Sequence, residues 1–228
     1  MTTEEWLHCL RSASFFTGLP SSATARATDK MVVRHHPPDR VILLENDWGT
    51  SVYFVLQGWV KIRTYNLEGK EVTLNILGKG EMFGEMAPLD QVPRSTDVIT
   101  LTEATIASIP AEDFVYLLQT EPKAGIHLAQ SMGKRLRQLN RRLRMRESDS
   151  TARVVDILLF LTESQGRVTP EGVTIPCLPH RELSSLTGLA RETVTRVLSK
   201  LEKQDLIRRD DDRDVFCIKD LVALEDLL

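Results

Sequence analysis

Two short helices separated by one glycine form the pattern that most restricts how this chain folds. Residues 179–203 place apolar side chains three or four positions apart, which is the spacing of one helix face. Gly188 interrupts the pattern and permits a backbone conformation that other residues rarely adopt. The apolar residues are Leu183, Leu186, Val194, Val197, Leu198 and Leu201. The segment therefore predicts a helix-turn-helix.

The outward face of the second predicted helix carries side chains that suit the edges of DNA bases. The N-terminal residues of the second helix of such a motif face those edges. Arg191 can bond O6 and N7 of a guanine, and Glu192 can accept a hydrogen bond from the amino group of a cytosine. The candidate DNA-contacting residues are His180, Arg191, Glu192, Thr193, Thr195 and Arg196. The alternative is an ordinary pair of helices with a solvated charged face.

A β-hairpin is predicted after these helices. Residues 206–209 and 215–218 are short β-rich runs on either side of an acidic turn. The acidic residues of the turn are Asp210, Asp211, Asp212 and Asp214. Such a hairpin commonly follows a helix-turn-helix as a wing. Its Arg208 and Arg209 either contact DNA phosphates or form plain surface.

The first half of the chain alternates short apolar runs with turn residues. The runs are residues 31–36, 40–44, 52–56, 59–65, 72–77 and 98–109. Short strands with regularly placed turns indicate an antiparallel sandwich or barrel. A helix is expected before them, at Glu4–Arg11.

A long helix is predicted after Pro122. From Met132, the apolar residues Leu136, Leu139 and Leu143 follow at steps of four, three and four, which is the seam of a coiled coil. We therefore expect a homodimer formed through this helix. The alternative is a helix packed on its own domain.

The net charge of −3 conceals a basic segment around this helix. Residues 123–153 contain 9 Lys/Arg and 2 Asp/Glu, whereas the regions before and after them are acidic. The basic side chains opposite the seam are Lys134, Arg135, Arg137, Arg141, Arg142, Arg144 and Arg146. We expect this face to be exposed, either as solvated surface or as a site for anions.

A domain boundary is predicted at residues 147–150. Asp149 or Ser150 can cap a new helix, because both side chains accept hydrogen bonds from the first free backbone N–H groups. The predicted parts are a sensor domain at 1–122, a long helix with a hinge at 123–148, and a DNA-binding domain at 149–228.

Two motifs together resemble the Crp/Fnr family, of the cyclic-AMP receptor protein type. Gly-x-x-Arg-Glu-Thr-Val-x-Arg at 188–196 is similar to the DNA-binding motif of the family. Phe-Gly-Glu-Met at 83–86, followed by Pro-Arg-Ser-Thr at 93–96, is similar to its phosphate-binding cassette, and residues 53–62 are similar to the preceding strands. The resemblance implies an α+β chain: an N-terminal cyclic-nucleotide-binding, jelly-roll-like β-roll, a long dimerisation helix and a C-terminal winged helix-turn-helix.

The cassette residues have chemistry that suits a cyclic phosphodiester. Arg94 is a planar cation that can pair with the phosphate, and Ser95 adds a hydroxyl. Glu85 can accept a hydrogen bond from a ribose 2′-hydroxyl, and Gly84 lets the backbone approach the ligand closely. With Met86, these residues are the candidate ligand contacts of the first domain.

The base end of the site departs from the family pattern. Cyclic-AMP-binding members usually carry two adjacent hydroxyl residues on the long helix, where this chain has Leu139 and Asn140. The Asn140 amide can both donate to and accept from an adenine edge. We expect cyclic AMP as the effector, with further ligand contacts at Arg135 and Asn140.

The basic helix leaves a second effector open. Arg137 and Arg141 lie one helical turn apart, as do Arg142 and Arg146. Arginine pairs at that spacing occur in some receptors for cyclic di-GMP, where a guanidinium stacks on guanine and bonds to it. Cyclic di-GMP is therefore the alternative effector.

The resemblance also implies the partners. They are double-stranded DNA with a palindromic site of TGTGA-like half-sites, a second copy of the chain, and RNA polymerase. A nucleotide-binding signalling adaptor that acts through a protein partner is the alternative of a different class.

Other classes of function lack residues to support them. Three cysteines without close spacing, Cys9, Cys177 and Cys217, argue against a disulfide framework and an iron–sulfur cluster. We expect no metal, no haem and no enzymatic activity, since no histidine or acidic pair is placed by a motif. Without a long apolar run or a leader, we expect a cytoplasmic protein with no membrane partner.

Overall fold

The computed structural model describes residues 3–11, 13–210, 212 and 215–228. The chain forms two compact units, Met1–Lys134 and Arg135–Leu228. Their boundary falls inside one continuous helix, α5 (Pro122–Met145), so each unit holds part of that helix. The finer division at residues 122 and 148 stays a prediction. Asp211 and Asp214 of the predicted acidic turn lie outside the described residues.

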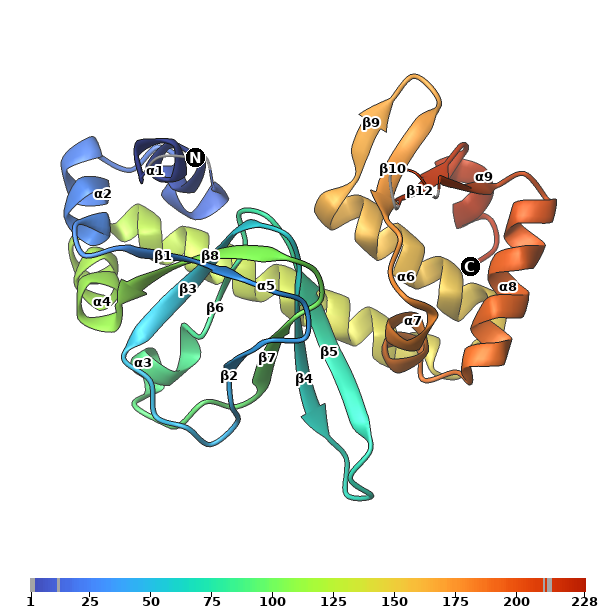
Figure 1. Cartoon of the computed structure of the whole chain (residues 1–228), viewed down its shortest axis with the longest axis horizontal. Helices are drawn as coiled ribbons and strands as arrows, with labels where there is room; N and C mark the ends of the chain where they lie inside the picture. The colour runs from blue at the N-terminus through green and yellow to red at the C-terminus, as the bar shows by residue number, and fades with distance from the viewer. Residues whose placement is uncertain (1–2, 12, 211, 213–214) are drawn as a thin grey trace. The chain divides into compact units, whose positions relative to one another are not determined.

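The first unit contains two four-stranded antiparallel sheets. One has the order β1-β8-β3-β6 and the other β2-β7-β4-β5 (Figure 1). The strands are β1 (Val32–His36), β2 (Val41–Leu43), β3 (Ser51–Gln57), β4 (Val60–Tyr65), β5 (Glu71–Leu77), β6 (Met82–Phe83), β7 (Asp97–Thr100) and β8 (Ala104–Pro110). The predicted sandwich is confirmed, and the run at 98–109 forms two strands. The short β6 was not predicted.

Apolar side chains from both sheets pack together in one cluster. Its buried members are Leu43, Val55, Val60, Leu77, Phe83, Val98, Ala104 and Ile106. They come from β2, β4, β5 and β7 of one sheet and from β3, β6 and β8 of the other. Burial of this shared surface joins the two sheets into a sandwich.

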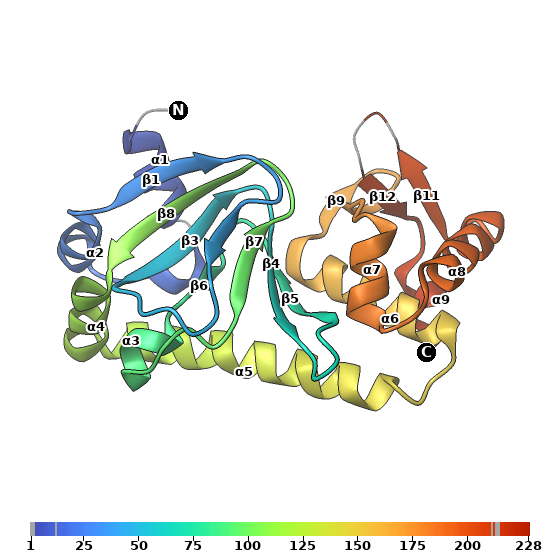
Figure 2. The ribbon, with the colours of Figure 1, turned by 60° about the horizontal axis from the view of Figure 1, so that its bottom comes forward.

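The helices of the first unit build a second core at one end of the sheets. They are α1 (Thr3–Arg11), a 3₁₀ turn (Ser14–Phe16), α2 (Ser21–Thr28), α3 (Met86–Asp90), α4 (Ala111–Thr120) and the start of α5. The Phe15 ring lies 5.9 Å from that of Phe54 and 5.4 Å from that of Phe114, measured between centroids. Ala124 and Leu128 of α5 are buried in the same cluster, which holds the start of the long helix against the sheets. Figure 2 shows α4 beside the beginning of α5, with α2 next to α4.

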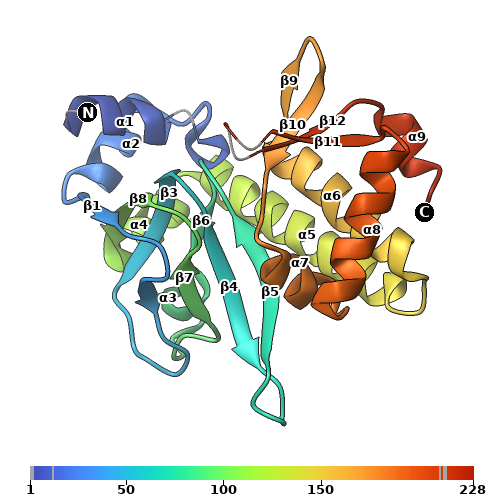
Figure 3. The same ribbon diagram turned by 45° about the vertical axis from the view of Figure 1, so that its right-hand side comes forward.

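The second unit combines packed helices with one small sheet. Its elements after α5 are α6 (Ser150–Gln165), β9 (Arg167–Thr169), β10 (Gly172–Pro176), α7 (His180–Thr187), α8 (Arg191–Lys203), β11 (Ile207–Asp210), β12 (Val215–Ile218) and α9 (Leu221–Glu225). The strands are antiparallel in the order β11-β12-β10-β9 (Figure 3). The predicted wing hairpin is confirmed as β11 and β12, and β10 extends it because it pairs with β12.

The seam of α5 is an exposed apolar stripe. Leu136, Leu139 and Leu143 are 60%, 40% and 59% exposed, whereas Met132 packs against the core of the first unit. A stripe of large apolar side chains on a charged helix is unfavourable in water unless a partner covers it.

The expectation that the whole basic face of α5 is exposed is wrong for Arg142. Its guanidinium lies 4.5 Å from the centre of the Phe160 ring of α6, and burial lowers its pKa to about 10, with Asp156 only partly offsetting that effect. Arg141, next to it, forms ion pairs with Asp156 and, at 3.0 Å, with Glu163. The helical pattern alone did not show that α6 packs against this face.

Among the described residues, no helix is long and apolar enough to cross a membrane.

Candidate functional site

The cassette begins where β6 ends. Gly84 follows Phe83 with a φ of +77°, and Glu85 then stands immediately before the short helix α3. A Cβ at Gly84 would lie 2.8 Å from Nη1 of Arg94. Only glycine therefore combines this backbone conformation with the close approach of the arginine.

Arg94 is the buried cation of the cassette. It is 4% exposed, it donates to the carbonyl oxygen of Gly84, and its Nη2 donates to the carbonyl oxygen of Ser51 at 2.8 Å. Its Nε is buried and has no hydrogen-bond partner within the described part of the chain. Burial lowers the pKa of Arg94 from its usual value, and Tyr53 and Glu85 only partly offset this. A buried guanidinium with an unused donor favours an anionic ligand.

The backbone on both sides of Arg94 is held by the loop between β2 and β3. The Arg94 N–H donates to the carbonyl of Asp47 at 2.8 Å, and the Asn46 N–H donates to the carbonyl of Arg94 at 2.8 Å. Gly49 of this loop passes so close to the guanidinium that a Cβ there would lie 2.1 Å from Nη2. The sequence reasoning missed Gly49 as part of the site, because nothing in its local pattern indicates contact with a residue 45 positions away.

An aromatic side chain supports the same guanidinium. Tyr53 of β3 stacks on Phe83 with centroids 5.2 Å apart, and the Arg94 guanidinium lies 5.9 Å from the Tyr53 ring centre. From the sequence, Tyr53 was expected only to lie in a strand. The available signal was its place in the family pattern at residues 53–62, where three apolar residues follow it.

The other predicted cassette residues differ in exposure. Glu85 is 3% exposed, whereas Met86 is 47% exposed and Ser95 is also exposed. The structure thus brings Gly84, Glu85 and Arg94 into one buried cluster. Met86 and Ser95 lie at its surface.

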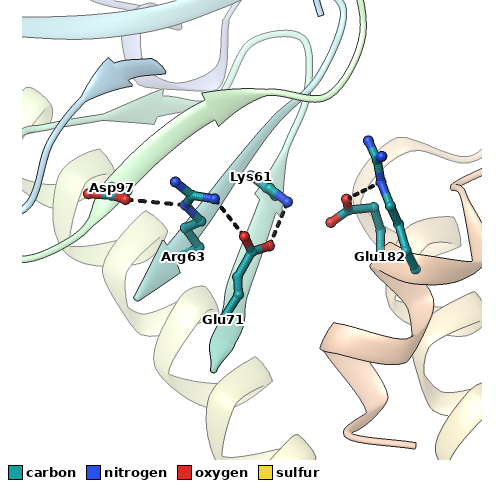
Figure 4. A network of polar contacts seen from close by, with 6 residues as sticks. Lys61, Arg63, Glu71, Asp97 and Glu182 are labelled. Carbon is teal, nitrogen blue, oxygen red and sulfur yellow. Dashed lines mark hydrogen bonds and ion pairs between the residues drawn. The ribbon is translucent and has the colours of Figure 1, made fainter. Parts of the chain in front are cut away.

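A polar network fixes the strand that follows the cassette. Figure 4 shows Arg63 between two carboxylates: Nη1 lies 2.6 Å from Glu71 Oε2, and Nε lies 3.2 Å from Asp97 Oδ2. Lys61 Nζ contacts the other oxygen of Glu71 at 2.6 Å. Although burial favours the neutral acid, the hydrogen bonds from Lys61 and Arg63 hold the pKa of Glu71 below its ordinary value. This network was not predicted from the sequence, because its members come from three different strands, β4, β5 and β7.

The predicted contacts for the base lie further along α5. Arg135 is half-buried and Asn140 is exposed, and both belong to the second unit. The cassette belongs to the first unit, so the description of each unit by itself does not bring these residues together. Their contact with a ligand stays a prediction.

The helix-turn-helix has the predicted geometry. Gly188 ends α7 with a φ of +67°, and the Gly188 N–H donates to the Ser184 carbonyl at 2.8 Å. The Arg153 side chain of α6 donates to the Thr187 carbonyl at the same turn. Val194, one of four buried apolar residues on α8, is fully enclosed. The turn is therefore closed by backbone, side-chain and apolar contacts together.

The outward face of α8 is exposed where DNA contacts are predicted. Arg191, Glu192, Thr195 and Arg196 are exposed, and Thr193 is half-buried. Their exposure is a condition for contact with base edges, and the contacts themselves stay a prediction.

A histidine of α7 is joined to this face. His180 Nδ1 lies 2.8 Å from the Thr195 hydroxyl, which in turn donates to the Arg191 carbonyl at 3.0 Å. Burial lowers the pKa of His180, and the charges of Arg209 and Arg191 lower it further. Arg209 of the wing and Arg191 of α8 thus both place positive charge near His180, which Glu202 opposes more weakly. Of the two wing arginines, Arg208 forms an ion pair with Glu171.

Comparison with known proteins identifies the family of each of the two domains. The family model of the cyclic nucleotide-binding domain matches residues 33–121, and that of the Crp-like helix-turn-helix domain matches residues 152–227. The cyclic AMP receptor protein of Thermus thermophilus is 30% identical over 199 residues, covering 87% of this chain and 90% of that protein.

Solved structures share the fold. FixK2 of Bradyrhizobium japonicum is 17% identical, with a TM-score of 0.75 over 86% of this chain and 96% of the other. The c-di-GMP responsive global regulator CLP of Xanthomonas campestris is 24% identical, with a TM-score of 0.68 over 88% of this chain and 100% of the other. With a cyclic nucleotide-binding domain followed by a Crp-like helix-turn-helix domain, the chain belongs to the Crp/Fnr family of transcription regulators.

Proposed function

We propose that the protein is a homodimeric transcription regulator whose binding to palindromic DNA is controlled by cyclic AMP. The observation that carries the effector site is Arg94, whose buried Nε has no hydrogen-bond partner among the described residues. One negative phosphate oxygen would satisfy that donor and compensate the buried charge. Glu85, buried beside it, supplies the acceptor for a ribose hydroxyl.

The contacts that the arginines of α5 make favour cyclic AMP over cyclic di-GMP as the effector. In each predicted arginine pair, one guanidinium already has a role inside the second unit: Arg141 pairs with Asp156, and Arg142 packs on Phe160. Neither pair therefore offers two free guanidiniums to a guanine. Cyclic di-GMP stays the second candidate, because Arg137 and Arg146 are exposed and a structurally similar regulator responds to it.

The exposed stripe of α5 supports the homodimer. Leu136, Leu139 and Leu143 fit a two-stranded seam, and two copies place two recognition helices on successive major grooves, about 34 Å apart. A ligand acts by binding one arrangement of the pair more tightly than the other. RNA polymerase is the expected further partner, and the cytoplasm is the expected site of action.

Calorimetric titration with cyclic AMP, cyclic GMP and cyclic di-GMP tests the effector. DNA affinity is then measured for a duplex with two inverted TGTGA half-sites, with and without the nucleotide that binds. We expect cyclic AMP to bind and to increase DNA affinity. Binding of cyclic di-GMP alone would refute the proposed effector. Absence of DNA binding under every ligand would refute the proposed regulator and favour the signalling adaptor.

A further inference from the structure

The histidine that begins α7 has a fixed tautomer. The Thr195 hydroxyl has one proton, which it donates to the Arg191 carbonyl at 3.0 Å. Its oxygen must therefore accept the 2.8 Å hydrogen bond from His180, so Nδ1 of His180 carries a proton. Nε2 is then the ring atom that gains or loses the second proton. It has no hydrogen-bond partner within the described part of the chain.

Charged groups from two elements face this ring. Arg191 and Arg209, from α8 and β11, oppose its positive form, and Glu202 of α8 favours that form more weakly. On its own helix, the neighbouring Arg181 forms an ion pair with Glu182 at 3.2 Å. In the protein without DNA, the net field and the partial burial of the ring favour neutral His180.

The position of the ring indicates what it meets on DNA. The first helix of a helix-turn-helix crosses the sugar–phosphate backbone, while the second enters the major groove. His180 is the first residue of that first helix and is joined to Thr195 of the second. A neutral Nε2 offers a lone pair, which repels a phosphate oxygen, whereas a protonated Nε2 donates to it.

We propose that His180 contacts a DNA phosphate through protonated Nε2, so that DNA binding is coupled to proton uptake by each protomer. This inference rests on the proposed DNA-binding function and adds to it a dependence on pH. Thr195 is the positioning residue, since its hydroxyl orients the ring. The negative phosphate favours the protonated ring, which burial, Arg209 and Arg191 disfavour in the free protein.

The test measures DNA affinity between pH 6 and pH 8 by fluorescence anisotropy, using the duplex with two inverted TGTGA half-sites and saturating cyclic AMP. Calorimetry in two buffers of different ionisation enthalpy counts the protons. We expect proton uptake to be largest at a pH between the pKa values of His180 in the free and the DNA-bound protein. A shift of one unit on binding takes up about half a proton per protomer there, and it makes binding about tenfold tighter per protomer at a pH below both values than at a pH above both.

Substitutions separate His180 from other titrating groups. His180→Gln keeps an amide donor but cannot titrate, so its DNA affinity is expected to lose this pH dependence. His8→Gln makes the same change at an exposed position of α1, and it is expected to keep the wild-type profile. Thr195→Val is expected to weaken binding several-fold and to shift the pH midpoint, and Thr195→Ser is expected to restore both.

Three outcomes would count against the inference. Tight binding by the wild type without proton uptake would overturn it, as would an unchanged pH profile in His180→Gln. A Thr195→Val variant with a wild-type profile would remove the positioning role. No DNA binding at any pH would instead overturn the regulator function, a result distinct from these three.

Discussion

The guanidinium of Arg142 on α5 lies 4.5 Å from the centre of the Phe160 ring on α6. Together with the ion pair between Arg141 and Asp156, this contact attaches the last turns of α5 to α6 within the second unit. Asp156 is 2% exposed, so its charge compensates two neighbouring arginines in a site with little water.

Removing the buried carboxylate should destabilise the second unit. Asp156→Ala leaves the buried Arg142 charge without its nearest compensation, and we expect a loss of about 3 kcal/mol in the free energy of unfolding. Urea denaturation followed by circular dichroism measures it. Glu163→Ala is the matched control, because Glu163 is 53% exposed and its pair with Arg141 should contribute less than about 1 kcal/mol. Equal losses in both variants would contradict this role for Asp156.

Arg94→Ala should abolish cyclic AMP binding. The variant also leaves the carbonyls of Gly84 and Ser51 without their donor, so we expect a folded protein that is less stable by about 1–3 kcal/mol. Calorimetric titration measures the ligand, and thermal unfolding verifies the fold. Arg34→Ala, on the exposed side of β1, is expected to bind as the wild type does. Unchanged affinity in Arg94→Ala would show that the nucleotide binds elsewhere.

Glu71 should make the first unit sensitive to acid. Burial opposes its charge, but the bonds from Lys61 and Arg63 prevail and lower its pKa. Its stabilising effect is therefore complete above the pKa of an unfolded glutamate, about 4.3, and is lost as the pH falls through the lower folded value. We expect Glu71→Gln to lower the free energy of unfolding by about 1 kcal/mol at pH 7, and by close to nothing at a pH below the folded pKa of Glu71. Urea denaturation at pH 7 and at a pH below the folded pKa checks this. Glu68→Gln, at an exposed position between β4 and β5, is the control.

Charges in the α5 seam should separate the dimer. The double variant Leu136→Glu, Leu143→Glu places repelling carboxylates where two helices would meet, and we expect monomers in sedimentation equilibrium. DNA affinity should fall with dimerisation, because one half-site then binds alone. Leu67→Glu alters an equally apolar side chain that is fully exposed at the β4–β5 hairpin, and it should leave the dimer intact. A dimer that survives the double variant would place the interface elsewhere.

Arg191→Ala should relax base preference at one position of each half-site, at a cost of about 1–3 kcal/mol. Competition binding with single-base variants of the duplex measures it. Lys200→Ala removes an exposed charge later on α8, and it should weaken binding to all sequences equally. Uniform loss of affinity in Arg191→Ala would assign that side chain to a phosphate.

Features with a local cause were predictable from the sequence. Asp149 was expected as a possible cap, and its carboxylate accepts from the N–H groups of Thr151 and Ala152 at 2.6 and 2.9 Å. The turn at Gly188 also has a local cause. So do the two strands that the turn at residues 66–69 joins, because each of these features depends on a few neighbouring residues.

Features that depend on packing between distant elements were not predictable. The pair of Arg141 with Asp156 requires a particular crossing of α5 and α6, which no helical period defines. Gly49 and Tyr53 join the cassette only because β3 and its preceding loop fold beside Arg94. The motif thus identified the cation but not the residues that bury it.

The continuity of α5 across the unit boundary limits how the protein can move. Ala124, Leu128 and Met132 fix the helix to the sensor, and Arg141 and Arg142 fix it to the DNA-binding unit. Between those attachments lie residues 133–140, about two helical turns. A reorientation of the units that keeps both attachments must therefore be absorbed as bending or twisting of that span. Its stiffness would then set how much work an effector must do to change the affinity for DNA.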